Sequence, residues 1–146
     1  MGLENATVMP TLAVTDIKAA REFYGELLGL RGLGTTVPEE NDMVYECASG
    51  SYVYIYERET PSGSTATACA FSVDDLDAVV AALRERGVKF EEYDIPEMGI
   101  KTVDSIATTG PVRTAWVTDP SGNILAIDNS MSVIKGGGVK PLPDEG

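Results

Sequence analysis

The pattern of the first half of this sequence returns in the second half, and this repeat constrains the fold more than any other feature. A shift of 59 residues places Leu12 on Phe71, Val14 on Val73 and Asp16 on Asp75. In each half an alternating strand leads to an aspartate, an apolar stripe at helical spacing, a glycine and then further strands. The repeat therefore predicts two copies of one β-α-β-β-β unit, each with one helix to cover one face of a sheet.

In the first copy, Met9–Thr15 alternates well enough for a strand, with Leu12 and Val14 on one face. Asp16 follows as a helix N-cap, and Gly29 ends the helix in the left-handed conformation that glycine tolerates. The sequence then predicts a strand near 30–36, an acidic loop, and a hairpin with arms at 43–47 and 52–56 that turns at residues 49–50.

In the second copy, the strand is expected at 66–73, the N-cap at Asp75 and the helix end at Gly87. A further strand is expected at 88–93, followed by a long loop at 94–111 that either closes over a site as a lid or packs against a partner. The last hairpin turns at Asp119–Gly122, because Pro120 fixes the second turn position and Gly122 accepts a positive φ.

The length of 146 residues suits one domain. We expect this domain to span 1–130, with one module at about 8–60 and the second at about 66–130. Residues 131–146 contain three consecutive glycines and two prolines, so we expect a flexible tail there.

Charge and composition limit the partners. The net charge of −12, from 23 acidic and 11 basic residues, repels phosphate backbones and argues against nucleic acid. No apolar run approaches the roughly 20 residues of a membrane span, and the N-terminus lacks a signal-peptide pattern. Two cysteines are too few for a disulfide framework, so a cytoplasmic location is expected.

Three motifs in this order and spacing resemble the vicinal oxygen chelate superfamily, which includes glyoxalase I, extradiol dioxygenases and bleomycin-resistance proteins. They are the first helix with its Phe23-Tyr24 and Leu28-Gly29-Leu30, the run Phe71-Ser-Val-Asp-Asp75, and the turn Asp119-Pro-Ser-Gly-Asn123. The resemblance covers about residues 8–130. It implies an α+β fold in which two βαβββ modules form a curved, cup-like mixed sheet, and it implies a homodimer.

Enzymes of that superfamily hold a divalent metal with His and Glu side chains from four strands. The resemblance places those positions at Met9, Tyr54, Ala68 and Ala126, and the chain contains no histidine. Methyl groups offer no lone pair and an un-ionised phenol is a poor ligand, so we expect neither a metal nor another cofactor. An improvised site that uses Asp128 or Cys47 remains an alternative.

Rings, methyl groups and hydroxyls take the place of metal ligands in the expected cup. If Leu12 and Val14 face the helix, Met9 and Thr11 face the cup, and the first hairpin is expected to pair Tyr45 with Tyr54. The candidate ligand-binding residues are Met9, Thr11, Tyr45, Tyr52, Tyr54, Tyr56, Arg113, Trp116, Ala126 and Asp128. Arg113 is the cation expected to meet an anionic ligand. The tyrosines alternatively serve only strand packing or a dimer interface.

The aromatic cup predicts a metal-free protein that binds a small planar or amphipathic organic molecule, by sequestration as in bleomycin-resistance proteins or by sensing. The alternative is a glyoxalase- or dioxygenase-type enzyme with a non-standard divalent metal site, where Tyr54 or Asp128 serves as ligand or acid–base group. A third hypothesis is a dimeric interaction module with a filled, vestigial cup.

Overall fold

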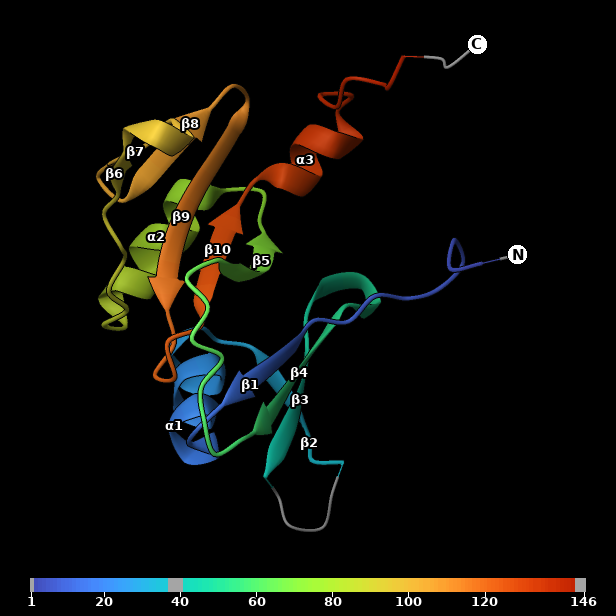
Figure 1. Ribbon diagram of the computed structural model, residues 1–146, viewed down its shortest axis with the longest axis vertical. Coiled ribbons are helices and arrows are strands. Elements are labelled where there is room, and N and C mark those ends of the chain that lie inside the picture. The colour runs from blue at the N-terminus through green and yellow to red at the C-terminus, as the bar shows by residue number, and fades with distance from the viewer. Residues whose placement is uncertain (1, 37–40, 144–146) are drawn as a thin grey trace. The chain divides into compact units, whose positions relative to one another are not determined.

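The computed structural model describes residues 2–36 and 41–143 (Figure 1). The chain forms two compact units, the first from Met1–Cys69 with Thr118–Ile124 and the second from Ala70–Val117 with Leu125–Gly146. Both are α+β, as the sequence predicts. Within the described ranges no helix is both long and apolar enough to cross a membrane.

The first unit is built on a four-stranded sheet with the order β1-β4-β3-β2. β1 pairs with β4 in parallel, and the other pairs are antiparallel. The strands are β1 (Thr11–Val14), β2 (Arg31–Gly34), β3 (Asp42–Glu46) and β4 (Tyr52–Glu57), and a 3₁₀ turn, η2 (Ala48–Gly50), joins β3 to β4.

One helical segment follows β1, and its start and end are as predicted. The Asp16 carboxylate accepts hydrogen bonds from the N–H groups of Lys18 and Ala19 before α1 (Ile17–Arg21), and Gly29 has φ of 79°. Between them lies a π-helical stretch, η1 (Glu22–Leu27), in which the Leu28 N–H reaches the Phe23 carbonyl at 2.8 Å. Helical periodicity does not distinguish this wider turn from an α-helix.

The expected pairing of Tyr45 with Tyr54 is wrong by one residue. Tyr45 pairs with Val53, and Val44 pairs with Tyr54. The cause lies in the turn, because Cys47 leaves the strand and its N–H donates to the Ser51 carbonyl at 2.8 Å. A one-residue shift in register moves a side chain to the other face of the sheet.

A second sheet, which belongs mainly to the second unit, repeats this topology with the order β5-β10-β9-β8-β7-β6. The run β5-β10-β9-β8 matches β1-β4-β3-β2, which confirms the internal repeat. The elements are β5 (Thr67–Ser72), α2 (Leu76–Glu85), β6 (Asp94–Ile95), η3 (Pro96–Met98), β7 (Ile100–Val103), β8 (Ile106–Thr109), β9 (Val112–Thr118), β10 (Ile124–Asp128) and α3 (Ser130–Lys135). Asp75 caps α2 through the Ala78 N–H, as predicted.

Two expectations for the second unit are wrong. Residues 88–93 form no strand and contribute only an isolated bridge between Phe90 and Val117. The expected loop at 94–111 contains β6, β7 and β8 instead. In the β7–β8 turn, Asp104 and Ser105 have φ of 56° and 75°. Such positions usually hold glycine, so the sequence does not predict a turn here.

The predicted tail also begins differently, because α3 occupies its first residues. This helix is tied to the preceding strands by the Met131 N–H, which donates to the Ser72 hydroxyl at 2.8 Å, and by the Ser132 hydroxyl, which lies 3.1 Å from the Asp74 carboxylate. The flexibility of the rest of the tail stays a prediction.

A candidate ligand-binding face on the first sheet

The first sheet has one buried face and one face that is only partly covered. Val53 and Ile55 are buried on the helix side, while Tyr52, Tyr54 and Tyr56 alternate with them and are half-buried. In the parallel pairing of β1 with β4, Thr11 stands opposite Tyr54 and Ala13 opposite Tyr56. We call the surface formed by Thr11, Ala13, Tyr52, Tyr54 and Tyr56 the tyrosine face.

Two rings of the tyrosine face are aligned for stacking. The Tyr54 and Tyr56 rings lie nearly parallel, with an interplanar angle of 15° and centroids 6.0 Å apart. Parallel rings on adjacent same-face positions offer a flat aromatic edge to a planar molecule, at roughly 0.5–1.5 kcal/mol per aromatic contact beyond its area. The face is therefore shaped for stacking.

A buried carboxylate orients the hydroxyl of Tyr54. Asp42 is 1% exposed and accepts a 2.6 Å hydrogen bond from the Tyr54 hydroxyl. Thr36 donates to the same carboxylate through its N–H at 2.9 Å and through its hydroxyl. The bond to Asp42 raises the pKa of Tyr54, so the phenol keeps its proton. Because that proton is committed to Asp42, the Tyr54 oxygen, which also lies beside the Thr36 hydroxyl, can act toward a ligand only as an acceptor.

A cavity of about 340 Å³ opens beside Tyr56 in the same unit. Thr11, Ala13, Arg58 and Ala68 also line it. Its size lies within the range of small-molecule sites. Arg58 continues the alternation of Tyr52, Tyr54 and Tyr56, and its N–H extends the ladder by donating to the Val14 carbonyl at 2.7 Å. Arg58 is not among the residues expected from the sequence, although the same period of two identifies it.

Tyr45 is not on this face. Its side chain is 2% exposed, and its ring centroid lies 6.2 Å from that of Tyr24 in the helical segment. The one-residue shift in register explains the difference, because it turns Tyr45 toward the helix.

Arg113 is likewise on a different surface from the one expected. Along β9, Ala115 and Val117 are fully buried and Arg113 has their parity, whereas Trp116 has the opposite parity. Both terminal nitrogens of Arg113 bind the Asp77 carboxylate of α2, at 2.8 and 3.0 Å. Arg113 and Trp116 therefore do not share a face of the sheet.

The remaining candidates have different surroundings. Met9 is 43% exposed just before β1, and Ala126 and Asp128 are buried within β10. The Asp128 carboxylate accepts from the Ser130 N–H and hydroxyl, at 3.0 and 2.6 Å, at the start of α3. Trp116 is half-buried and meets the Tyr93 ring edge-on at 5.3 Å. Ligand binding by these residues stays a prediction.

The side chains present do not fit the metal site that the resemblance implies. A thioether at Met9, methyl groups at Ala68 and Ala126, and a Tyr54 phenol that donates to Asp42 supply no set of hard ligands. Among residues 2–36 and 41–143, no group of three or more His, Cys, Asp or Glu side chains could hold a metal ion. The absence of a metal or other cofactor stays a prediction.

The Asp119–Gly122 turn has a structural role in the first unit. Asp119 accepts from the N–H groups of Ser121 and Asn123, at 2.9 and 2.8 Å, and from the Tyr24 hydroxyl at 2.6 Å. Asn123 donates to Asp119 at 2.9 Å and to the Ala13 carbonyl at 2.7 Å. Gly122 has φ of 91°, as the turn requires. The turn thus fastens β1 and the first helical segment together.

Comparison with known proteins agrees with this architecture. The profile of the Glyoxalase/Bleomycin resistance protein/Dioxygenase superfamily matches residues 6–127. The structure is similar to that of a glyoxalase/bleomycin resistance protein from Catenulispora acidiphila DSM 44928, with 30% identity, coverage of 84% of this chain and 96% of that one, and a TM-score of 0.57.

Two more distant structures share the fold. A glyoxalase/dioxygenase from Nostoc punctiforme is 20% identical, covers 88% of this chain and 93% of its own length, and gives a TM-score of 0.63. TnmS3, an antibiotic binding protein from Streptomyces sp. CB03234, is 22% identical, with 84% and 96% covered and a TM-score of 0.62. No curated protein matches the sequence. With its profile match over most of the chain, the protein belongs to the glyoxalase/bleomycin resistance protein/dioxygenase superfamily.

Proposed function

We propose that this protein binds a small planar or amphipathic organic molecule on the tyrosine face without a metal, and that it acts by sequestration or sensing. The observation that carries the proposal is the pair of parallel Tyr54 and Tyr56 rings beside a cavity of about 340 Å³. Antibiotic binding by TnmS3, a protein of the same fold, supports this reading.

The polar groups around the rings define the ligand further. Tyr54 presents an acceptor oxygen because its own O–H donates to Asp42, so it suits an N–H or O–H group of the ligand. Arg58 lines the cavity with Tyr56 and suits a carboxylate or a phenolate. The best ligand therefore combines a planar ring system, a hydrogen-bond donor and one anionic group.

Anthraquinone-2-carboxylate and its methyl ester are probes that separate stacking from charge. We expect isothermal titration calorimetry to show saturable binding of the carboxylate, with affinity lost about tenfold or more in Tyr56→Ala, which removes one aromatic wall. Arg58→Gln should reduce the preference for the carboxylate over the ester, whereas Arg31→Gln, an exposed cation of the same sheet, should leave it unchanged.

Tyr93→Ala is the aromatic control, because Tyr93 lies outside the tyrosine face. Equal losses in Tyr56→Ala and Tyr93→Ala, or no binding by a panel of planar drugs that includes bleomycin, would contradict the proposal. The metal-dependent enzyme predicted as the alternative requires stoichiometric divalent metal after purification without a chelator, which elemental analysis measures. The homodimer predicted from the family resemblance is tested by sedimentation equilibrium.

A further inference from the structure

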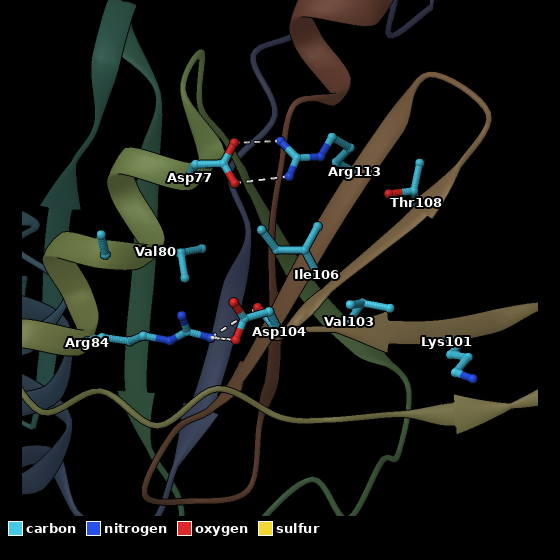
Figure 2. Close-up of a pocket in the computed structure, with 10 residues that line it drawn as sticks. Asp77, Val80, Arg84, Lys101, Val103, Asp104, Ile106, Thr108 and Arg113 are labelled. Carbon is cyan, nitrogen blue, oxygen red and sulfur yellow. Dashed lines mark hydrogen bonds and ion pairs between the residues drawn. The ribbon is translucent and has the colours of Figure 1, made fainter.

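A second cavity lies in the second unit, on the helix side of its sheet (Figure 2). Its volume is about 430 Å³, which is large enough for a small organic molecule. α2 forms one wall, and the β7–β8 hairpin with Arg113 of β9 forms the rest. None of its lining residues belongs to the tyrosine face.

Positive charge is concentrated around this cavity. Arg84, Lys101 and Arg113 line it, so it holds three of the 11 basic residues of a chain whose net charge is −12. Two acidic residues, Asp77 and Asp104, also line it, so the lining residues carry an excess of one positive charge. Glu92 lies outside the lining and accepts from the Ser105 hydroxyl, within electrostatic reach of Arg84. An excess of this size matches a monoanion better than a dianion such as phosphate.

The three basic side chains differ in how many of their donor nitrogens already have hydrogen-bond or ion-pair partners. Arg113 uses both terminal nitrogens on Asp77, at 2.8 and 3.0 Å. Arg84 uses Nη2 alone, for the Asp104 carbonyl at 3.1 Å and the Ser105 hydroxyl at 2.6 Å. Across the described parts of the chain, its Nε and Nη1 have no hydrogen-bond partner, and Lys101 has no ion pair.

Asp104 does not satisfy the charge of Arg84. The closest approach of its carboxylate to Arg84 is 3.9 Å, beyond hydrogen-bond distance, and its side chain is 91% exposed. The Arg84 guanidinium also lies 5.6 Å from the centre of the Phe90 ring, a contact that helps to hold it in place. A carboxylate can therefore accept from Nη1 of Arg84 without displacing a strong partner.

Apolar side chains separate the two arginines. Figure 2 shows Val80 and Ile106 between the Asp77–Arg113 pair at one end and Arg84 at the other. Val80 is 2% exposed and Ile106 is half-buried. A ligand that reaches Arg84 through this cavity meets hydrocarbon on the way, so its body gains from being apolar.

We propose that this cavity binds a small monocarboxylate with a short aliphatic or aromatic body. The carboxylate accepts from Nη1 of Arg84, the body rests on Val80 and Ile106, and Lys101 adds attraction at longer range. The site is separate from the tyrosine face and does not depend on the function proposed for it.

Sodium hexanoate and hexanamide are matched probes, alike in shape but different in charge. In a ¹H–¹⁵N correlation titration of the full chain, we expect hexanoate to shift the amide signals of Val80, Ala81 and Ile106 saturably. Hexanamide should bind about tenfold more weakly, since it lacks the charge-assisted bonds to Arg84. Equal binding of the two probes, or no saturable shifts in these signals, would overturn the proposal.

Two kinds of variant locate the site. Arg84→Gln should bring hexanoate down to the affinity of hexanamide, and its spectrum reports whether the β7–β8 turn is retained. Ala81→Leu fills the cavity from an exposed position on α2 and should abolish binding, while Ala82→Leu, its exposed neighbour outside the cavity, should not. Leucine is a good helix former, so both leucine variants keep the fold. Equal affinities in Ala81→Leu and Ala82→Leu would refute the assignment.

Discussion

The hydrogen bond from Tyr24 to Asp119 gives a prediction with both a magnitude and a pH signature. Tyr24 is fully buried, Asp119 is 4% exposed, and their oxygens are 2.6 Å apart. Tyr24→Phe removes the hydroxyl that donates this hydrogen bond and keeps the aromatic ring. Asp119 then keeps three donors, which are the N–H groups of Ser121 and Asn123 and the Asn123 side-chain amide.

The size of the loss follows from these contacts. A hydrogen bond to a charged group contributes about 1.5–3 kcal/mol, and the remaining donors keep Asp119 from being left unsatisfied. We therefore expect Tyr24→Phe to lower the free energy of unfolding at pH 7 by about 2 kcal/mol. For a chain of this size that corresponds to a fall in Tm of about 4–8 °C.

The same contact sets the pH dependence. Burial, together with the charge of Asp119 and the hydrogen bond to it, raises the pKa of Tyr24 above its ordinary value of 10.0. A raised pKa in the folded state means that the stabilisation is complete below the unfolded pKa and is lost as the pH rises above it. Between pH 10 and 11 the wild-type protein should lose about 1 kcal/mol through this group. Tyr24→Phe should lack that loss, so the two proteins converge.

Urea unfolding followed by circular dichroism at pH 7, 10 and 11 measures both effects. Tyr52→Phe is the matched control, because Tyr52 is half-buried and lies on the tyrosine face rather than in the core. It should change stability by less than about 0.5 kcal/mol. A Tyr24→Phe protein within 0.5 kcal/mol of wild type at pH 7, or one that falls as steeply as wild type above pH 10, would refute the reasoning.

Three further predictions concern single contacts. Asp75→Ala removes the N-cap of α2 and should lower the free energy of unfolding by about 1 kcal/mol in urea titrations. Burial raises the pKa of Cys69 to about 11, so at pH 8 iodoacetamide should alkylate it at least 100-fold more slowly in the folded protein than in urea, as mass spectrometry would show. The hydrogen bond from Arg113 lowers the pKa of Asp77, so the stability that Arg113→Gln removes should be largest at low salt above the unfolded pKa of the aspartate, and should be lost as the pH falls through the lowered pKa of the folded state.

Local signals predicted much of each repeat. Asp16 and Asp75 cap their helices, and Gly29 and Gly87 follow with positive φ. These residues act through contacts within a few positions of the chain, which is why sequence spacing reveals them. The β7–β8 hairpin was not predicted, because residues distant in the sequence stabilise its turn. Arg84 donates to the Ser105 hydroxyl at 2.6 Å, and that hydroxyl donates to Glu92 at 2.7 Å.

The candidate site was predicted less completely, because the pairing register of the first hairpin and the face occupied by individual side chains were misjudged. One extra residue in the turn moved Tyr45 into the core, and no local pattern counts turn residues reliably. The face of the sheet on which Arg113 lies could have been predicted from the sequence, because Arg113 alternates in step with the apolar Ala115 and Val117 along β9. The side of the sheet on which Arg58 lies could have been predicted in the same way, because Arg58 continues the alternation of the tyrosines of β4.

The orientation of Tyr54 illustrates what spacing alone does not contain. Asp42 belongs to a stretch that composition describes as an acidic loop, and such a carboxylate would ordinarily be solvated. Here it is buried, and it accepts from Thr36 on one side and from Tyr54 on the other. The phenol is thereby fixed as an acceptor toward the open side of the sheet. In Asp42→Asn the Thr36 N–H holds the amide oxygen, so the amide NH2 faces Tyr54 and frees its hydroxyl to donate. A ligand with an N–H group should therefore bind the variant more weakly than wild type, whereas a ligand with only a carbonyl there should bind it no worse. We therefore expect the selectivity of the tyrosine face to depend on a buried acid that does not itself contact the ligand.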